Sequence, residues 1–195
     1  MPGQRRLPRA TPAHLGVPAT AISDFLDSLD DGPELHSLMV LRRGHVIAEG
    51  WWQPYRRELP RALFSLSKSF TSTAVGFAVA EGLLSVDDLL VDHLGDLAPA
   101  RPDPKLARMR VRHLLTMTTG HTTSIDEAVF STRRWAKTFL SLPIQAEPGT
   151  AFLYNTAATY VLSYLVQRLT GQRVLDYLRP PLLAPLGLEA TTWEQ

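Results

Sequence analysis

Ser65 and Lys68 stand three positions apart at the start of an otherwise apolar stretch. In a helix this spacing places both side chains on one face, within one turn. A serine hydroxyl becomes a nucleophile when a neighbour removes its proton, and an amine can do so if desolvation and the positive end of a helix lower its pKa. The free N–H groups of the first helical turn would face an oxyanion formed at Ser65. The pair therefore predicts a nucleophilic serine.

The same two residues also fit an ordinary helix start, in which the serine caps the helix and the lysine reaches the surface. Only three of the twenty basic residues are lysines, namely Lys68, Lys105 and Lys137. A lysine within an apolar helix is costly to bury unless it has a partner. The two residues alone leave both interpretations open.

The stretch that carries this pair, Phe64 to Gly82, reads FSLSKSFTSTAVGFAVAEG. It has no proline and is rich in small and apolar residues, which predicts a helix buried on most sides. The small side chains would let neighbouring elements approach its axis closely. Gly82 offers a left-handed stop at its end.

The elements around this central helix follow from periodicity and from turn residues. A helix is predicted over Pro18–Asp30, followed by a hairpin of two strands that turns at Arg42-Arg43-Gly44 and by a loop that leads to Ser65. The strands span Ser37–Leu41 and His45–Trp52, and later helices are expected over Leu83–Leu97 (short and irregular), Arg110–Thr118, Arg133–Leu142, Thr156–Thr170 and Arg173–Leu178. The prediction is an α+β chain with a loose arm over residues 1–17, a helix and two strands over 18–60, and a helical domain over 61–195.

Composition excludes several classes of function. The chain has 195 residues, a net charge of +1 and no cysteine, which argues against nucleic-acid or anionic-membrane binding, thiol catalysis and zinc-thiolate sites. Its six histidines show no close metal-ligand spacing, so no metal or cofactor is expected. The first residues lack the apolar run of a signal peptide and no stretch has the apolar length of a membrane helix, so a cytoplasmic location is expected.

Three segments occur in an order and spacing that together resemble one family. They read FSLSKSF, RVRHLLTMTTGH and PGTAFLYNTAATYVLSYLVQRLTG. The chain resembles the serine β-lactamase and penicillin-binding protein family, nearest to its class C-like esterases and amide hydrolases, from about Ala13 onward. No G-x-S-x-G elbow, G-x-G-x-x-G or phosphate-binding loop competes with this interpretation.

The resemblance implies roles for three residues. Ser65 would be the acylated nucleophile, Lys68 its proton-transfer partner, and Tyr154 the second base or the acid for the leaving group. The implied activity is hydrolysis of a small ester, amide or β-lactam. A tyrosine in such a place is also commonly a packing residue, so Tyr154 alone would not indicate catalysis.

This sequence departs from the family pattern at two places. The family's Y-x-N motif reads Tyr154-Asn155-Thr156 here, so Thr156 replaces the asparagine that contacts substrate, and Asn155 and Thr156 are the candidate substrate-binding residues. Nothing after Tyr154 matches the later K-T-G or H-x-G motif. Two further interpretations stay open: a weakly active or inactive fragment, or a covalent binding and sensor module that needs the missing C-terminal half. An open sheet edge would also permit self-association.

Overall fold

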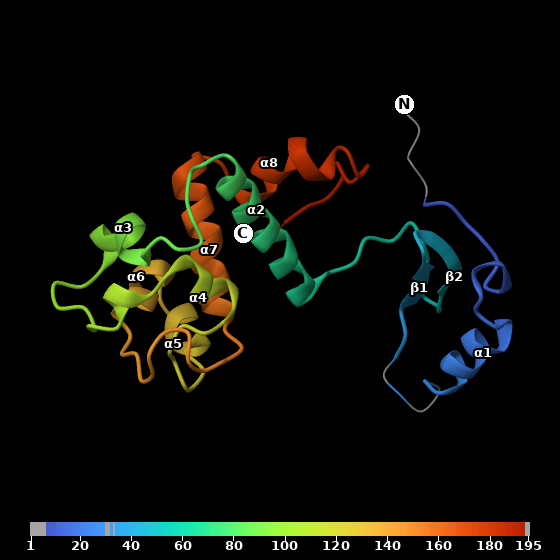
Figure 1. Ribbon diagram of the computed structural model, residues 1–195, viewed down its shortest axis with the longest axis horizontal. Helices are drawn as coiled ribbons and strands as arrows, with labels where there is room; N and C mark the ends of the chain where they lie inside the picture. Colours follow the sequence, from blue (N-terminus) through green and yellow to red (C-terminus); the bar gives the residue numbers. More distant parts are fainter. Residues whose placement is uncertain (1–6, 30–31, 33, 194–195) are drawn as a thin grey trace. The chain divides into compact units, whose positions relative to one another are not determined.

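The computed structural model describes residues 7–29, 32 and 34–193, and the chain divides into two compact units, Met1–Ala62 and Leu63–Gln195. Within the described residues, the first unit carries a short 3₁₀-helix, one α-helix and a hairpin. The second carries the remaining helices and every residue singled out for catalysis (Figure 1).

The first unit is organised around an antiparallel hairpin of β1 (Ser37–Arg42) and β2 (His45–Trp51), with α1 (Ala19–Asp27) before it. Arg43 and Gly44 both have positive φ, 48° and 76°, as a two-residue type I′ turn requires. The register shifts between Val40 and Leu41, so one residue bulges from the ladder. The predicted hairpin is confirmed.

The expected loose arm is wrong for the residues just before α1. Val46 donates its backbone N–H to the Pro8 carbonyl at 2.8 Å, and Ala10 donates to the Val46 carbonyl at 3.2 Å. A short 3₁₀-helix follows at Ala13–Leu15. Backbone pairing with β2 therefore orders part of this segment, which side-chain pattern alone did not indicate. Residues 1–6 of the predicted arm lie outside the described residues.

The second unit is built around α7 (Thr156–Thr170), which packs against α2 (Ser67–Ala80), α4 (Val111–Leu115) and α6 (Trp135–Ser141). Figure 1 shows α2 on one side of α7 and α6 on the other. The other elements are short: α3 (Leu90–Leu94), α5 (Asp126–Phe130), α8 (Val174–Leu178), a π-helical turn (Arg179–Leu183) and 3₁₀-helices at Phe64–Leu66, Gly95–Leu97 and Leu106–Arg108.

Clear local signals bound α7. The Asn155 Oδ1 accepts a hydrogen bond from the Ala158 N–H at 2.9 Å, which caps the first turn. Gly171 adopts φ 70° and its N–H bonds to the Gln167 carbonyl, which ends the helix. The helix spans Thr156–Thr170, as predicted. One of its faces is apolar and buried, and the buried residues are Ala157, Ala158, Val161, Leu162, Leu165 and Val166.

The predicted central helix differs from the structure in two ways. Its first turn is a separate 3₁₀-helix, and α2 itself begins at Ser67. Within the second unit α2 packs chiefly on α7 and α8, so it buries one face rather than most sides. Ala74 and Ala78, both 0% exposed, lie on that buried face, whereas Val79, outside it, is 38% exposed.

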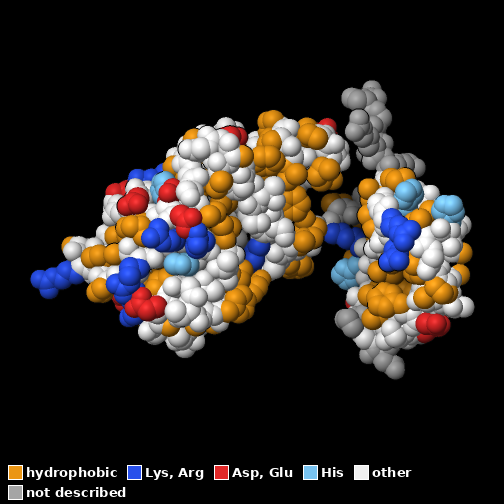
Figure 2. All heavy atoms as spheres, in the orientation of Figure 1, with side chains coloured by type: hydrophobic (Ala, Val, Ile, Leu, Met, Phe, Trp, Pro, Cys, Tyr) orange, Lys and Arg blue, Asp and Glu red, His pale blue; other side chains and the backbone are white. Residues whose placement is uncertain are grey.

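Hydrophobic side chains gather over α2 and α8 in Figure 2, whereas charged ones gather over the other end of this unit. The exposed apolar residues of this unit include Leu63, Phe64, Leu66, Val79, Leu83, Leu186 and Leu188. No described helix combines the length and apolar character needed to cross a membrane.

Gly120 is a position where only glycine fits. Its φ is 87°, and a Cβ there would lie 2.3 Å from the Ala146 carbonyl oxygen and 2.7 Å from the Ile144 Cγ2. We expect Gly120→Ala to lower the free energy of unfolding by roughly 1–3 kcal/mol, because both the clash and the positive φ oppose a side chain.

Gly76→Ala in α2 is the matched control, since a Cβ there meets nothing within 4 Å. It should raise the free energy of unfolding by about 0.5–1 kcal/mol. Urea unfolding followed by tryptophan fluorescence measures both changes. Equal stability of the two variants would contradict this account of the Gly120 turn.

Candidate active site

Ser65 lies between a lysine and a tyrosine that are far apart in the sequence. Lys68 donates from Nζ to Ser65 Oγ at 3.0 Å, and Tyr154 donates from its hydroxyl to the same oxygen at 2.6 Å. Ser65 and Tyr154 are separated by 89 positions, so the fold makes this contact. The structure therefore brings together the three residues that the sequence singled out for catalysis.

The Lys68 ammonium also lies over the face of the Tyr154 ring, 5.0 Å from its centroid. Such a position is favourable because the ring face carries partial negative charge. The lysine side chain is half-buried. Its contacts therefore supply the partner that a lysine in an apolar helix needs, and the interpretation of Lys68 as a residue that merely reaches the surface does not hold.

The pKa of the Tyr154 phenol is held below its ordinary value. The hydrogen bond with Ser65 contributes most, and the neighbouring Lys68 adds to it by hydrogen bonding and by its charge. Desolvation and the charge of Asp126 act in the opposite direction but are outweighed. Tyr154 is 50% exposed, so its side chain is open to water as well as to its two partners.

Ser65 sits in the 3₁₀-helix Phe64–Leu66, immediately before α2. The preceding Phe64 adopts φ 46°, which is unusual for a residue with a side chain, and its ring is 85% exposed. Backbone strain of this kind persists where the surroundings demand it, and it clusters at functional sites. The strained turn places Ser65 at the amino end of α2.

The segment that carries Tyr154 is held along the loop after α4. Three backbone hydrogen bonds join them: Ala146 N–H to Gly120 O at 2.8 Å, Gly149 N–H to Thr118 O at 2.7 Å, and Leu153 N–H to Met117 O at 3.0 Å. The close approach at Gly120 is part of this pairing. Two irregular segments thus support each other, although neither forms a strand.

The two candidate substrate-binding residues have different surroundings. Thr156 is half-buried at the start of α7. Asn155 is only 1% exposed, and its amide bonds inward, to the Ala158 N–H and to the Thr119 hydroxyl. We therefore assign Asn155 no direct contact with substrate. Its side chain is used to start α7, a role that the residue type and its place before a helix could have indicated.

The family model described as Beta-lactamase matches residues 36–195. The chain belongs to the beta-lactamase family. Among characterised members it is similar to penicillin-binding protein 4 of Amycolatopsis lactamdurans (29% identity over 88% of this chain and 44% of that protein). It is also similar to esterase EstB of Burkholderia gladioli, with 26% identity over 78% of this chain and 43% of that protein. A third relative is the 6-aminohexanoate-dimer hydrolase of Paenarthrobacter ureafaciens, with 29% identity over 92% of this chain and 50% of that protein.

The fold agrees with this assignment to the beta-lactamase family. The octameric penicillin-binding protein homologue from Pyrococcus abyssi superposes with a TM-score of 0.63 at 20% identity, over 88% of this chain and 43% of that one. The predicted family and fold are thus confirmed. The chain spans about half the length of the relatives and structures that it matches.

Three residues of this beta-lactamase-family site were not indicated by the sequence. Asp126 in α5 accepts from the Ala157 N–H at 3.0 Å and so supports the first turn of α7. Thr119 and His121 lie buried behind Asn155. The weak signal for α5 is the pair of acidic residues Asp126 and Glu127 in the first turn of a five-residue helix, which is too short for periodicity to identify.

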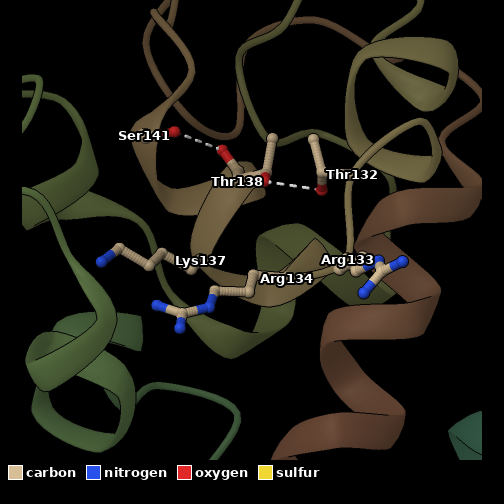
Figure 3. A pocket seen from close by; sticks show the side chains of 6 residues that line it. All are labelled: Thr132, Arg133, Arg134, Lys137, Thr138 and Ser141. Carbon is tan, nitrogen blue, oxygen red and sulfur yellow. Dashed lines mark hydrogen bonds between the residues drawn. The ribbon is translucent and has the colours of Figure 1, made fainter.

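A hollow of about 420 Å³ lies at α6 and is lined by Thr132, Arg133, Arg134, Lys137, Thr138 and Ser141. Figure 3 shows Arg134 and Lys137 running the same way while Arg133 points away from them. The Thr132 and Thr138 hydroxyls bond to each other at 2.9 Å, and Ser141 bonds to the Thr138 carbonyl. Neither of these contacts pairs a hydroxyl with a basic side chain, unlike the contact of Lys68 with Ser65.

His121 makes the stability of this unit sensitive to acid. Burial lowers its pKa below the ordinary 6.5, so unfolding takes up a proton once the pH falls below that value. We expect the free energy of unfolding to fall as the pH drops below about 6.5, by at most about 1.4 kcal/mol per pH unit for one group. The pKa of partly buried His113 is lowered too, chiefly by desolvation, and adds in the same direction.

The variant His121→Asn removes the titration and should flatten the acid side of the profile. Urea unfolding between about pH 5 and 8 measures it, the range in which histidine charge changes. His14→Asn, at an exposed position in the first unit, is the control. An unchanged slope in His121→Asn would show that the buried ring is not the source.

Proposed function

We propose that this chain is a serine hydrolase that cleaves ester or amide carbonyls through an acyl-enzyme on Ser65. The observation that carries the proposal is the double contact of Ser65 Oγ, with Lys68 at 3.0 Å and with Tyr154 at 2.6 Å. A nucleophile within hydrogen-bond reach of two groups that can hold its proton is the arrangement that activated serines require.

In the proposed first step Ser65 Oγ attacks the carbonyl carbon while its proton passes to the Tyr154–Lys68 pair. The lowered pKa of Tyr154 favours the phenolate as the acceptor, with the Lys68 ammonium beside it. The proton then passes to the leaving group as the tetrahedral intermediate collapses. A water molecule attacks the resulting ester, gives its proton to the same pair, and releases the acid and a free Ser65 hydroxyl.

The backbone N–H of Ser65, which stands immediately before α2, would stabilise the oxyanion. The N–H groups of Leu66 and Ser67 already bond to backbone carbonyls of residues 63–65. Each donor to an oxyanion is worth about 10²–10³ in rate. A site with one such donor would therefore keep measurable but reduced activity.

The substrate that we propose carries a small acyl group. A hollow of about 200 Å³ lies beside Lys68, with the apolar residues Leu114, Leu115, Met117 and Leu162 in its wall. Sites for whole drug-sized ligands have about 300–1,000 Å³, so this one suits a substituent. Relatives named as an esterase and as a 6-aminohexanoate-dimer hydrolase support ester and amide substrates.

A second candidate function is covalent capture without rapid turnover, or activity that appears only when further sheet and oxyanion elements are supplied. It is favoured by one observation, that the chain spans 43–50% of the three relatives. In this case Ser65 would be acylated, but the acyl group would persist. Self-association through a sheet edge remains a related proposal, checked by gel filtration.

Ser65→Ala should abolish labelling by a fluorophosphonate and release of p-nitrophenol from p-nitrophenyl butyrate, because it removes the nucleophilic oxygen. Intact-mass spectrometry detects the adduct. Ser131→Ala, an exposed serine at the end of α5, is the matched control and should keep both signals. Adduct formation in Ser65→Ala would place the nucleophile elsewhere, whereas a stable acyl adduct without turnover would favour the second candidate.

Ester hydrolysis should exceed β-lactam hydrolysis. The short Thr156 hydroxyl stands where the family motif has a longer amide, so recognition of a substrate amide is weakened. The measurement compares kcat/KM for p-nitrophenyl butyrate and for nitrocefin. Thr156→Asn should move the ratio towards nitrocefin, and a wild-type preference for nitrocefin would contradict this assignment.

A further inference from the structure

Three buried polar side chains form a chain behind the active site. Asn155 donates from Nδ2 to Thr119 Oγ1 at 3.3 Å, and that oxygen lies 2.9 Å from Nδ1 of His121. Each of the three residues is only 1% exposed. Buried polar groups are costly unless they are paired, so a connected set at this depth calls for an explanation.

The side chain of Asn155 donates one hydrogen bond and accepts another. Its Oδ1 accepts from the Ala158 N–H at 2.9 Å, while its Nδ2 donates to Thr119. Serine or aspartate at a helix start can accept, but neither offers an amide donor. Asparagine therefore joins the first turn of α7 to the loop after α4, which a simple cap would not do.

Tyr154 is held on both sides by the same loop. The residue before it, Leu153, donates its N–H to the Met117 carbonyl at 3.0 Å, and the residue after it bonds to Thr119. The phenol itself is 50% exposed, so core packing does not fix it. Its position against Ser65 has to come from its neighbours in the chain.

We propose that Thr119 and Asn155, supported by His121, are positioning residues that hold Tyr154 in reach of Ser65. This inference rests on the proposed function, in which Tyr154 takes the serine proton. These residues touch no reacting atom. They act by fixing the backbone on one side of Tyr154, while Met117 fixes it on the other.

His121 completes the set by orienting the Thr119 hydroxyl. Thr119 Oγ1 accepts from Asn155 and lies 2.9 Å from Nδ1 of His121, and the tautomer of the ring decides which of these two atoms donates. Burial favours the neutral ring, which can donate or accept at Nδ1. The ring is packed edge-on to Phe139, with centroids 5.5 Å apart, and its Nε2 has no hydrogen-bond partner among the described residues.

The test measures the ionisation of the Tyr154 phenol rather than the rate of catalysis. Near-ultraviolet absorbance reports phenolate formation, and the difference between the chain and Tyr154→Phe isolates Tyr154. Thr119→Val removes the shared hydroxyl at nearly constant shape, and Asn155→Ser keeps a cap while losing the amide donor. Both should raise the apparent pKa of Tyr154 towards its ordinary value, because a displaced phenol loses Ser65 and Lys68.

Thr118→Val is the matched control, since the Thr118 hydroxyl pairs with Thr116 outside this set. It should leave the Tyr154 titration unchanged. In parallel, fluorophosphonate labelling of Ser65 should slow on the order of 10²-fold in Thr119→Val and Asn155→Ser, since small misplacements at a site can cost that much. Melting temperatures establish that Asn155→Ser is folded at the temperature of the assay.

The outcomes separate this inference from the proposed function. A Tyr154 titration that is the same in wild type, Thr119→Val and Asn155→Ser overturns the positioning role, whether or not the chain is active. A shifted titration in both variants, with Thr118→Val unchanged, supports it. Absence of labelling in the wild type would count against Ser65 as the nucleophile, while the titration would still decide the role of Thr119 and Asn155.

Discussion

The contact between Ser65 and Tyr154 is the constraint on which the rest of the second unit depends. It joins the beginnings of two helices, and its length of 2.6 Å leaves little room for either helix to shift. Helices α2 and α7 can approach because both bury alanines, at Ala74, Ala78 and Ala158, each 0% exposed. The geometry of the active site therefore depends on the close packing of α2 against α7.

The surrounding loops serve the same contact by different means. A strained turn at Phe64 brings Ser65 to the end of α2, and paired irregular segments bring Tyr154 to the end of α7. Both side chains thus stand close to the first turn of a helix, in positions that the irregular segments set. The irregular segments are therefore as tightly constrained as the helices. At Gly120, for example, there is no space for a side chain.

The sequence predicted what local pattern encodes. The span of α7 follows from its helical pattern and a glycine stop, the hairpin follows from its glycine turn, and the Ser65–Lys68–Tyr154 grouping follows from motifs taken together. It did not predict the pairing of Pro8 with Val46, because backbone hydrogen bonds carry no side-chain signature. Nor did it predict the inward turn of the Asn155 amide or its partner Thr119. Such contacts between distant residues depend on the fold as a whole.

Ser65, Lys68 and Tyr154 are at least partly exposed, so the electrostatic interactions among them depend on the surrounding solution. Tyr154 is half exposed, and Lys68 acts on it across a site that water can enter. Dissolved ions screen charges in such places over about 8–10 Å at ordinary ionic strength, and over about 3 Å in molar salt. The readiness of Tyr154 to lose its proton is therefore set partly by the salt in its surroundings, so that a smaller fraction of Tyr154 would be ionised in brine than in dilute buffer.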